Sequence, residues 1–220
     1  MNDTATNGWR HKKPACALAL GIVIAVSGLS GCASGRGQPI EPSSAPGSSM
    51  ARFENDRYGI VFDYPSRLDV AHAFVSDYFL GDRWNPDVAA NIPGAALLSL
   101  TLPESNDITR AVLRVGASDD TRAVDVCQST PGSEQAEHVR LRGVDFTRMD
   151  HDNAAMNHYS RVHSYRGVHD DQCVAIDLIV TGTNPGVYGP EKPSKPPFDV
   201  DDGMARLEDL LDGLVFIDTR

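Results

Sequence analysis

The sequence lacks the short motifs that point directly to an enzyme or a metalloprotein. It contains no Gly-x-Ser-x-Gly elbow, no glycine-rich phosphate loop and no paired cysteines at zinc-binding spacing. Its histidines form no His-x-His or His-x-x-x-His pair, so spacing brings no two of them to one ion. We therefore expect no metal ion and no cofactor. A Ser-His-Asp triad stays open, because its members need not be neighbours in the sequence.

Basic side chains are also scarce. The 220 residues include 20 Lys and Arg against 30 Asp and Glu, a formal net charge of −10. This charge would repel nucleic acid and anionic lipid surfaces, so neither is expected as a direct partner. It would suit a basic protein partner, although solubility alone also explains it. The balance of 41% hydrophobic and 23% charged residues is that of a folded protein, and the length allows one domain.

The N-terminal segment has the parts of an export signal. A basic stretch with Arg10, Lys12 and Lys13 precedes residues 15–29, which carry no charge and end in small residues. This run is shorter than the roughly 20 residues that cross a bilayer comfortably as a helix. A cleaved signal peptide is therefore favoured over the alternative, a retained transmembrane anchor.

The end of this segment, Leu29-Ser30-Gly31-Cys32, resembles the lipobox of bacterial lipoproteins. The resemblance implies that residues 1–31 are removed and that Cys32 becomes the lipid-bearing first residue, with a diacylglyceryl group on its thiol and usually an acyl chain, such as palmitate, on its amine. Two or three acyl chains hold a protein firmly at a membrane. Ala33 stands where inner-membrane lipoproteins often carry Asp, which favours the periplasmic face of the outer membrane in a Gram-negative host. Cleavage would remove three basic side chains and one acidic one, which lowers the net charge to −12.

The rest of the chain divides into a tether and a domain. Residues 32–51 are predicted to be the lipidated cysteine and a flexible linker rich in Gly, Pro and Ser. As a random coil, the 17 residues from 33 to 49 would span on the order of 20–25 Å. Residues 52–220 are predicted to form a single domain.

Hydrophobic patterning predicts a domain made mostly of strands. Strands are expected over 58–65, 71–80, 95–102, 109–116, 139–149, 157–169 and 173–181, with turns at 103–107, 150–153 and 170–172. Irregular loops are expected over 81–94 and 182–198, and a helix capped by Asp199 or Asp201 should run to Asp212, before a closing strand at 214–217. Short turns imply antiparallel pairing, so the fold class is α+β, a largely antiparallel sheet with a C-terminal helix and short flanking helices.

Both ends of this domain resemble one known fold. Arg52-Phe53, followed by the strand 58–65, and the helix at 200–212 that runs directly into 214–217 are similar to the opening and the close of the PsbP-like fold of photosystem II extrinsic subunits. The resemblance would cover nearly all of 52–220, although Leu68 stands where members often have an aromatic residue. It implies an antiparallel sheet flanked by helices and a binding or assembly role, and it transfers no catalytic residue.

Four cysteines divide between the signal, the lipid anchor and the domain. Cys16 leaves with the signal peptide and Cys32 is lipidated, which leaves Cys127 and Cys173 as a pair. In the oxidising compartment implied by export, a Cys127–Cys173 disulfide is expected. Two separate buried thiols are the alternative.

Histidines gather in the second half of the sequence, at His138, His151, His158, His163 and His169. His163 and His169 lie six residues apart, roughly 20 Å along a strand, so they cannot share an ion. Asp150-His151-Asp152 and His169-Asp170-Asp171 are better explained as turns than as metal sites. These observations favour a non-catalytic binding or assembly module, of which an acidic inhibitor or immunity-type protein is one version. The alternative is an envelope hydrolase with its site in 182–198 or near His163.

Overall fold

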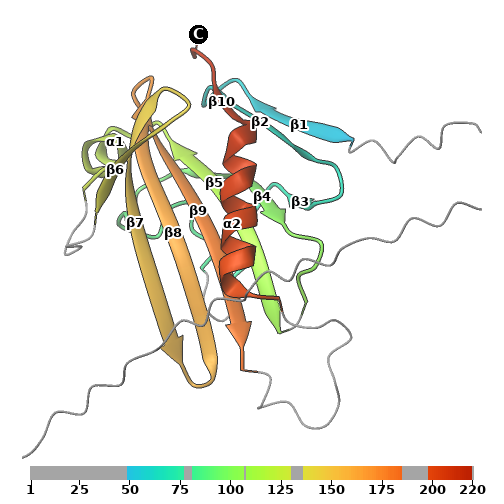
Figure 1. The fold of residues 1–220 in the computed structure, drawn as a ribbon. Coiled ribbons are helices and arrows are strands. Elements are labelled where there is room, and N and C mark those ends of the chain that lie inside the picture. The colour runs from blue at the N-terminus through green and yellow to red at the C-terminus, as the bar shows by residue number, and fades with distance from the viewer. Residues whose placement is uncertain (1–48, 77–80, 107, 130–135, 185–197, 220) are drawn as a thin grey trace, which may run out of the picture. The chain divides into compact units, whose positions relative to one another are not determined.

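Seven antiparallel strands form the main sheet of the structure, a computed structural model (Figure 1). In sheet order the strands are β3 (Asp69–Ala71), β4 (Ala95–Thr101), β5 (Thr109–Ser118), β9 (Gln172–Thr183), β8 (His158–His169), β7 (Val144–Ala155) and β6 (Glu137–Leu141). The structure describes residues 49–76, 81–106, 108–129, 136–184 and 198–219, which belong to one compact unit. The predicted signal peptide, Cys32 and most of the linker lie outside these ranges.

A second, smaller sheet combines strands from both ends of the domain. It contains β1 (Met50–Asn55), β2 (Ile60–Pro65) and β10 (Leu214–Phe216), with β2 in the centre. The inward face of β2 carries Ile60, Phe62 and Tyr64, which alternate as predicted from the sequence; all three are buried, as is Tyr58 in the turn before the strand. Because β10 pairs with β2, the last strand of the domain lies against one of the first.

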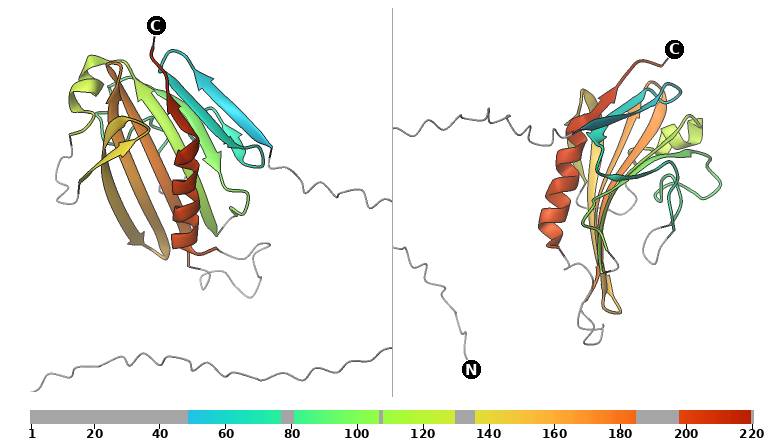
Figure 2. Two further views of the ribbon diagram at one scale, coloured as in Figure 1. Left: turned by 45° about the horizontal axis from the view of Figure 1, so that its top comes forward. Right: turned by 90° about the vertical axis from the view of Figure 1, so that its right-hand side faces the viewer.

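The C-terminal helix α2 (Val200–Leu210) covers one face of the main sheet and continues into a 3-10 turn, η2 (Leu211–Gly213) (Figure 2). The Asp199 carboxylate caps the helix by accepting hydrogen bonds from the backbone N–H groups of Asp201 and Asp202. The buried side of the helix carries Met204 and Leu207. These side chains pack on the face of β9 formed by Val174, Ile176, Leu178 and Val180, which are fully buried. The predicted α+β class is thus observed as a mostly antiparallel structure with two α-helices among its described residues.

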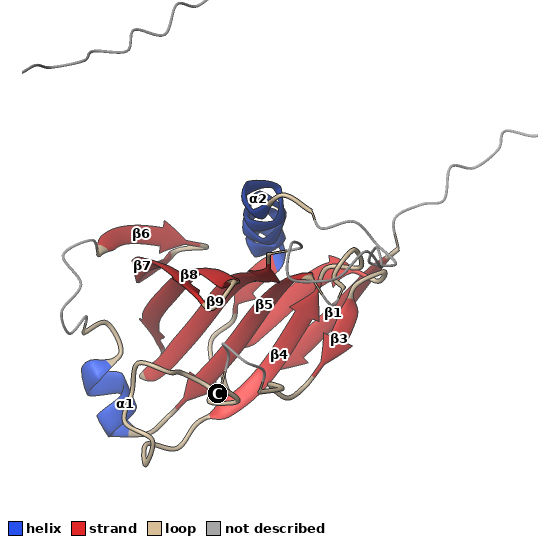
Figure 3. Cartoon of the chain, turned by 90° about the horizontal axis from the view of Figure 1, so that it is seen from below, coloured by secondary structure: helices blue, strands red, loops and turns tan. Residues whose placement is uncertain are grey.

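A second layer covers the opposite face of the main sheet (Figure 3). It contains the short helix α1 (Thr121–Val126), a flanking helix whose position was not predicted, and the segment 81–94, which forms turns as expected. Cys127 follows α1 and is joined by a disulfide to Cys173 on β9, which is consistent with the predicted pair. Trp84 and Val88 pack around this disulfide and form a separate small core.

Three two-residue turns connect the long strands. They are Arg142–Gly143, Met156–Asn157 and Asp170–Asp171, and all six residues have positive φ. Two residues with positive φ match the twist of the flanking strands, which is why such turns close β-hairpins.

Two of these turns overturn parts of the sequence prediction. The strand expected over 139–149 is two strands, β6 and β7, because the chain reverses at Arg142–Gly143. The turn expected over 150–153 lies inside β7, and the reversal comes later, at Met156–Asn157. Asp150 and Asp152 pair with arginines instead of capping a turn.

The prediction of a strand over 71–80 is also wrong for residues 72–76, because β3 ends at Ala71. Residues 72–76 are held by side chains of the sheet rather than by a strand neighbour. The guanidinium of Arg114 donates to the carbonyl oxygen of Val75 at 2.6 Å and lies over the Phe74 ring, and the His72 ring lies 3.2 Å from the Leu97 carbonyl oxygen. The expected loop 182–198 lies mostly outside the described residues, but Gly182 and Thr183 belong to β9.

Candidate binding groove

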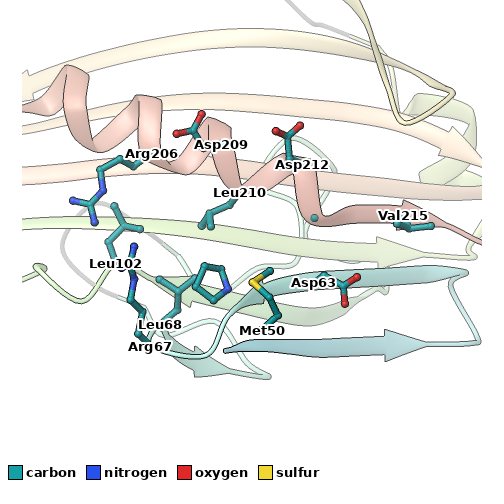
Figure 4. A pocket seen from close by; sticks show the side chains of 12 residues that line it. Met50, Asp63, Arg67, Leu68, Leu102, Arg206, Asp209, Leu210, Asp212 and Val215 are labelled. Atoms are coloured by element: carbon teal, nitrogen blue, oxygen red, sulfur yellow. The ribbon is translucent and has the colours of Figure 1, made fainter. Parts of the chain in front are cut away.

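A groove of about 470 Å³ lies between the outer face of the small sheet and the C-terminal half of α2 (Figure 4). This volume is within the range typical of ligand sites. The lining residues are Met50, Asp63, Pro65, Arg67, Leu68, Leu102, Arg206, Asp209, Leu210, Asp212, Gly213 and Val215. They come from four separate segments of the chain, at Met50, 63–68, Leu102 and 206–215.

The floor of the groove is set by close backbone contacts. Leu68 is placed by the turn after β2, where its N–H donates to the Pro65 carbonyl oxygen at 3.1 Å. Leu102 follows β4, and both leucines are buried. At the opposite wall the chain leaves η2 through Gly213, where a Cβ atom would overlap the carbonyl oxygen of Asp63. Glycine therefore allows α2 and β10 to approach the backbone of β2.

Two apolar side chains line the groove and remain open to solvent. Met50 is 59% exposed and Val215 is 44% exposed. They stand on β1 and β10, the two edge strands of the small sheet. Together with the buried leucines they give the groove an apolar surface, which is the usual basis of affinity in a binding site.

The rim contributed by α2 and β2 is acidic. Asp209 has no side-chain partner among the described residues, and Asp212 is ion-paired with Arg142 at 2.6 Å. Figure 4 shows both carboxylates projecting from the helix on the same side. Asp63 is held by a two-point hydrogen bond from Arg52, which lowers the pKa of the Asp63 carboxyl.

The other end of the groove is basic. Arg206 donates to Glu104 at 2.7 Å, and Arg67 has no hydrogen bond or ion pair with a described residue. Burial raises the pKa of Glu104, but the hydrogen bond from Arg206 and the charges of Arg206 and Arg67 lower it by more. The groove therefore has an apolar floor, an acidic side and a basic end.

The alternative hydrolase hypothesis placed a site in 182–198, which lies mostly outside the described residues, or near His163 on β8. His163 lies between the sheet and α2, with Nδ1 at 2.9 Å from Glu208 and 3.0 Å from Arg148, and Nε2 at 3.8 Å from Asp150. Neither serine nor cysteine is among its described partners. This cluster joins α2 to β7 and β8 through ion pairs, and no lining residue of the groove takes part in it.

The other histidines do not converge. The His169 ring lies 3.2 Å from the Ile217 carbonyl oxygen, His158 lies 2.8 Å from the Thr183 hydroxyl, and His138 and His151 are exposed. Within the described ranges, no group of three His, Cys, Asp or Glu side chains could hold a metal ion. None of the described helices has the length and apolar character needed to cross a membrane.

Comparisons with known proteins show little. No family model matches the chain, and no curated protein matches its sequence. The fold is similar to the solution structure of cyanobacterial PsbP (CyanoP) from Synechocystis sp. PCC 6803, with 12% identity, a TM-score of 0.40, and coverage of 82% of this chain and 100% of that one. This neighbour has the fold that both ends of the sequence resemble. A likeness of this size nevertheless carries no argument about function.

Sequence reasoning missed the groove. Its residues come from α2, from three strands and from the turns beside them, and no local pattern brings these segments together. The one available signal was the apolar side chain of Val215 on the outward face of the closing strand, since outward positions of a half-buried strand are usually polar.

Proposed function

We propose that the protein is a lipid-anchored envelope lipoprotein that binds another protein and performs no chemistry of its own. The Leu29-Ser30-Gly31-Cys32 lipobox supports the anchor and the export. The single observation that supports the binding role is the groove, in which the solvent-open side chains of Met50 and Val215 adjoin an acidic rim.

The partner that this groove fits is an extended protein segment with apolar side chains and at least one Lys or Arg. The apolar floor would bury its apolar side chains. The Asp209 carboxylate, which has no partner among the described residues, would receive the basic group. The net charge, −10 for the full sequence and −12 after the predicted cleavage, would speed the approach of a basic partner, since complementary charge acts mainly on the association rate.

The anchor is tested by expressing the full chain in a Gram-negative bacterium supplied with a clickable palmitate analogue. The wild-type protein should take up the label and fractionate with membranes, whereas Cys32→Ala should do neither. Mass spectrometry that finds residues 1–31 still attached to the wild-type protein would contradict the lipobox assignment.

The binding role is tested with peptides selected by phage display against the chain from Ala33 onward. Selected peptides should combine apolar residues with Lys or Arg. Val215→Lys, which puts a cation in the apolar part of the groove, should weaken their binding by about ten-fold or more. The matched control is Val126→Lys on α1, also an exposed valine but on the other face of the sheet, and it should have no effect. Equal binding to both variants would show that the groove is not the site.

A further inference from the structure

Strand β7 is only partly covered on its outer side. β6 pairs with residues 144–148 and no further. Residues 150–155 extend beyond this pairing, and all of them are exposed. No other described strand runs along them, and in Figure 1 the lower part of β7 forms the outer edge of the sheet. We refer to residues 150–154 as the open edge.

The β7–β8 hairpin determines which backbone groups of the open edge point outward. In a hairpin with a two-residue turn, the residues that flank the turn exchange hydrogen bonds, and bonded positions then alternate along each strand. Ala155 and His158 flank the turn here. The N–H and C=O groups of Asp150, Asp152 and Ala154 therefore point away from β8.

The hairpin at the other end of β7 gives the same assignment, because β6 and β7 are also joined by a two-residue turn. No hydrogen bond from a described residue reaches the outward backbone groups of the open edge. Donors and acceptors thus alternate along roughly 14 Å of strand. Such a row is a ready template for pairing with another strand.

The side chains at these three positions share a face with α2 and lie in an acidic region. Two ion-pair clusters lie along this face, and each has two carboxylates for one guanidinium group. The clusters are Asp152, Asp201 and Arg161, and Asp150, Glu208 and Arg148. His163 offsets the charge of the second cluster only when it is protonated. All four carboxylates are partnered, but they are between 39% and 84% exposed, so a further cation can reach them.

A hollow of about 350 Å³ adjoins the open edge on the same face. It is lined by Asp152 and Ala154 of the edge, by Tyr159 and Arg161 of β8 and by Val200 at the start of α2. The Tyr159 and Val200 side chains give it apolar surface. A long basic side chain can lay its methylene stem on such a surface while its charge stays in water. None of these residues lines the groove beside the small sheet.

We propose that the open edge binds an extended segment of another protein as an added antiparallel strand, with Lys or Arg at alternate positions on the side of α2. In strand addition, main-chain hydrogen bonds provide affinity and alternate side chains provide specificity. Residues placed opposite Asp150, Asp152 and Ala154 would share their face of the sheet. Basic side chains at those positions would therefore meet the two acidic clusters and the hollow.

A second copy of this chain fits the open edge less well than a basic partner. The antiparallel register that pairs residues 150–154 of two copies in full places Asp152 opposite the same residue of the other copy. Like charges directly opposite each other are destabilising in a sheet, and the chain as a whole has a net charge of −10. Charged side chains on an exposed edge are also a common protection against self-association.

The test is fluorescence anisotropy of a short labelled peptide, in which Lys alternates with Thr, added to the full-length protein in zwitterionic detergent micelles. In the proposed antiparallel strand the amides of the Lys residues point to the open edge and those of the Thr residues point away. A peptide with N-methylated Lys amides should therefore bind about ten-fold more weakly or worse, because several hydrogen bonds are lost. A peptide with N-methylated Thr amides keeps the same charge and should bind as the unmodified one does.

Variants of the protein locate the site. Asp152→Lys reverses one charge of the open edge and should weaken binding by about ten-fold. The matched control is Asp145→Lys, the same change at an exposed position of β7 that β6 covers, and it should leave binding unaltered. Ala154→Pro removes one outward N–H, and proline is tolerated where the N–H of an edge strand faces solvent. It should weaken binding with little change in the melting temperature.

The outcomes separate strand addition from other modes of binding. Equal binding of the two methylated peptides, or no difference between Asp152→Lys and Asp145→Lys, would overturn the proposal. A loss of binding in Val215→Lys would also overturn it, because the peptide would then occupy the groove. A wild-type dimer in sedimentation that Ala154→Pro converts to a monomer would show that a second copy covers the edge instead. The groove is tested by its own selected peptides, so either proposal can fail without the other.

Discussion

Tyr165 shows how the contact between α2 and the sheet changes the chemistry of one residue. Its ring is buried beneath the helix, on the strand face that also carries His163. Burial raises the pKa of the Tyr165 phenol to about 12, because desolvation penalises the phenolate; the charge of Arg148 lowers the pKa, and those of Glu208 and Asp150 raise it. The phenol therefore keeps its proton in the folded protein at a pH where an exposed tyrosine has lost it.

We predict that one tyrosine ionises late in an alkaline titration. After a rapid pH jump, tyrosinate absorbance should show a step near pH 12 that Tyr165→Phe removes. Because the folded pKa lies above the unfolded value of 10.0, the stability that the neutral phenol contributes is complete below pH 10 and is lost as the pH rises through about 12. The difference corresponds to roughly 2–3 kcal/mol at most. A late step that persists in Tyr165→Phe would contradict the assignment.

Single residues also show what a sequence reveals about a site. Cys16 is assigned to the predicted signal peptide and Cys32 to the predicted lipid anchor, so counting leaves Cys127 and Cys173 as a pair. The structure is consistent with this pairing. Arg114 and Asp177, by contrast, lie 63 positions apart in the sequence and sit opposite each other only because β5 pairs with β9. Periodicity places a residue on a face of its own strand, but it carries no information about which strand lies alongside.

At the scale of elements, α2 is the part of the fold that the sequence predicts most fully. A capping aspartate, apolar residues at spacings of three and four, and a terminal glycine are each local signals, and all are present between Asp199 and Gly213. The end of β3 shows the opposite case, because alternation continues through residues 72–76 while the chain leaves the sheet. The hydrogen bond from Arg114 that holds this segment is a tertiary contact and has no local signature.

We predict that Asp199 stabilises α2 through the hydrogen bonds that it accepts, and not through its negative charge. Asp199→Ala should lower the free energy of unfolding by about 1 kcal/mol, because two N–H groups at the start of α2 lose their acceptor. Asp199→Asn keeps an acceptor oxygen and should lose much less. Urea unfolding followed by circular dichroism compares the three proteins. Equal losses in both variants would mean that the negative charge, not the hydrogen bonds, provides the stabilisation.

At the scale of the whole molecule, the disulfide joins the main sheet to the layer that contains α1. Cys127 follows α1 and Cys173 is the second residue of β9, 46 positions further along the chain. The bond therefore restricts a large part of the unfolded chain.

We predict that replacing both cysteines by alanine lowers the free energy of unfolding by up to about 4 kcal/mol, the chain-entropy value for a loop of this length. Denaturant titrations of the oxidised wild type and of Cys127→Ala/Cys173→Ala measure the difference. Adding a reductant should destabilise only the wild type. A reductant effect of the same size in the double variant would rule out the disulfide as its source.

The position of β10 has a consequence for translation. The backbone N–H of Ile217 donates to the Gly59 carbonyl oxygen at 2.9 Å, so residues translated after the whole main sheet complete a small sheet begun near Met50. A nonsense mutation after Leu210 would keep every strand of the main sheet and the whole predicted export signal, yet it would remove three lining residues of the groove, Asp212, Gly213 and Val215. Only chains translated through Val215 can therefore present a finished groove to a partner.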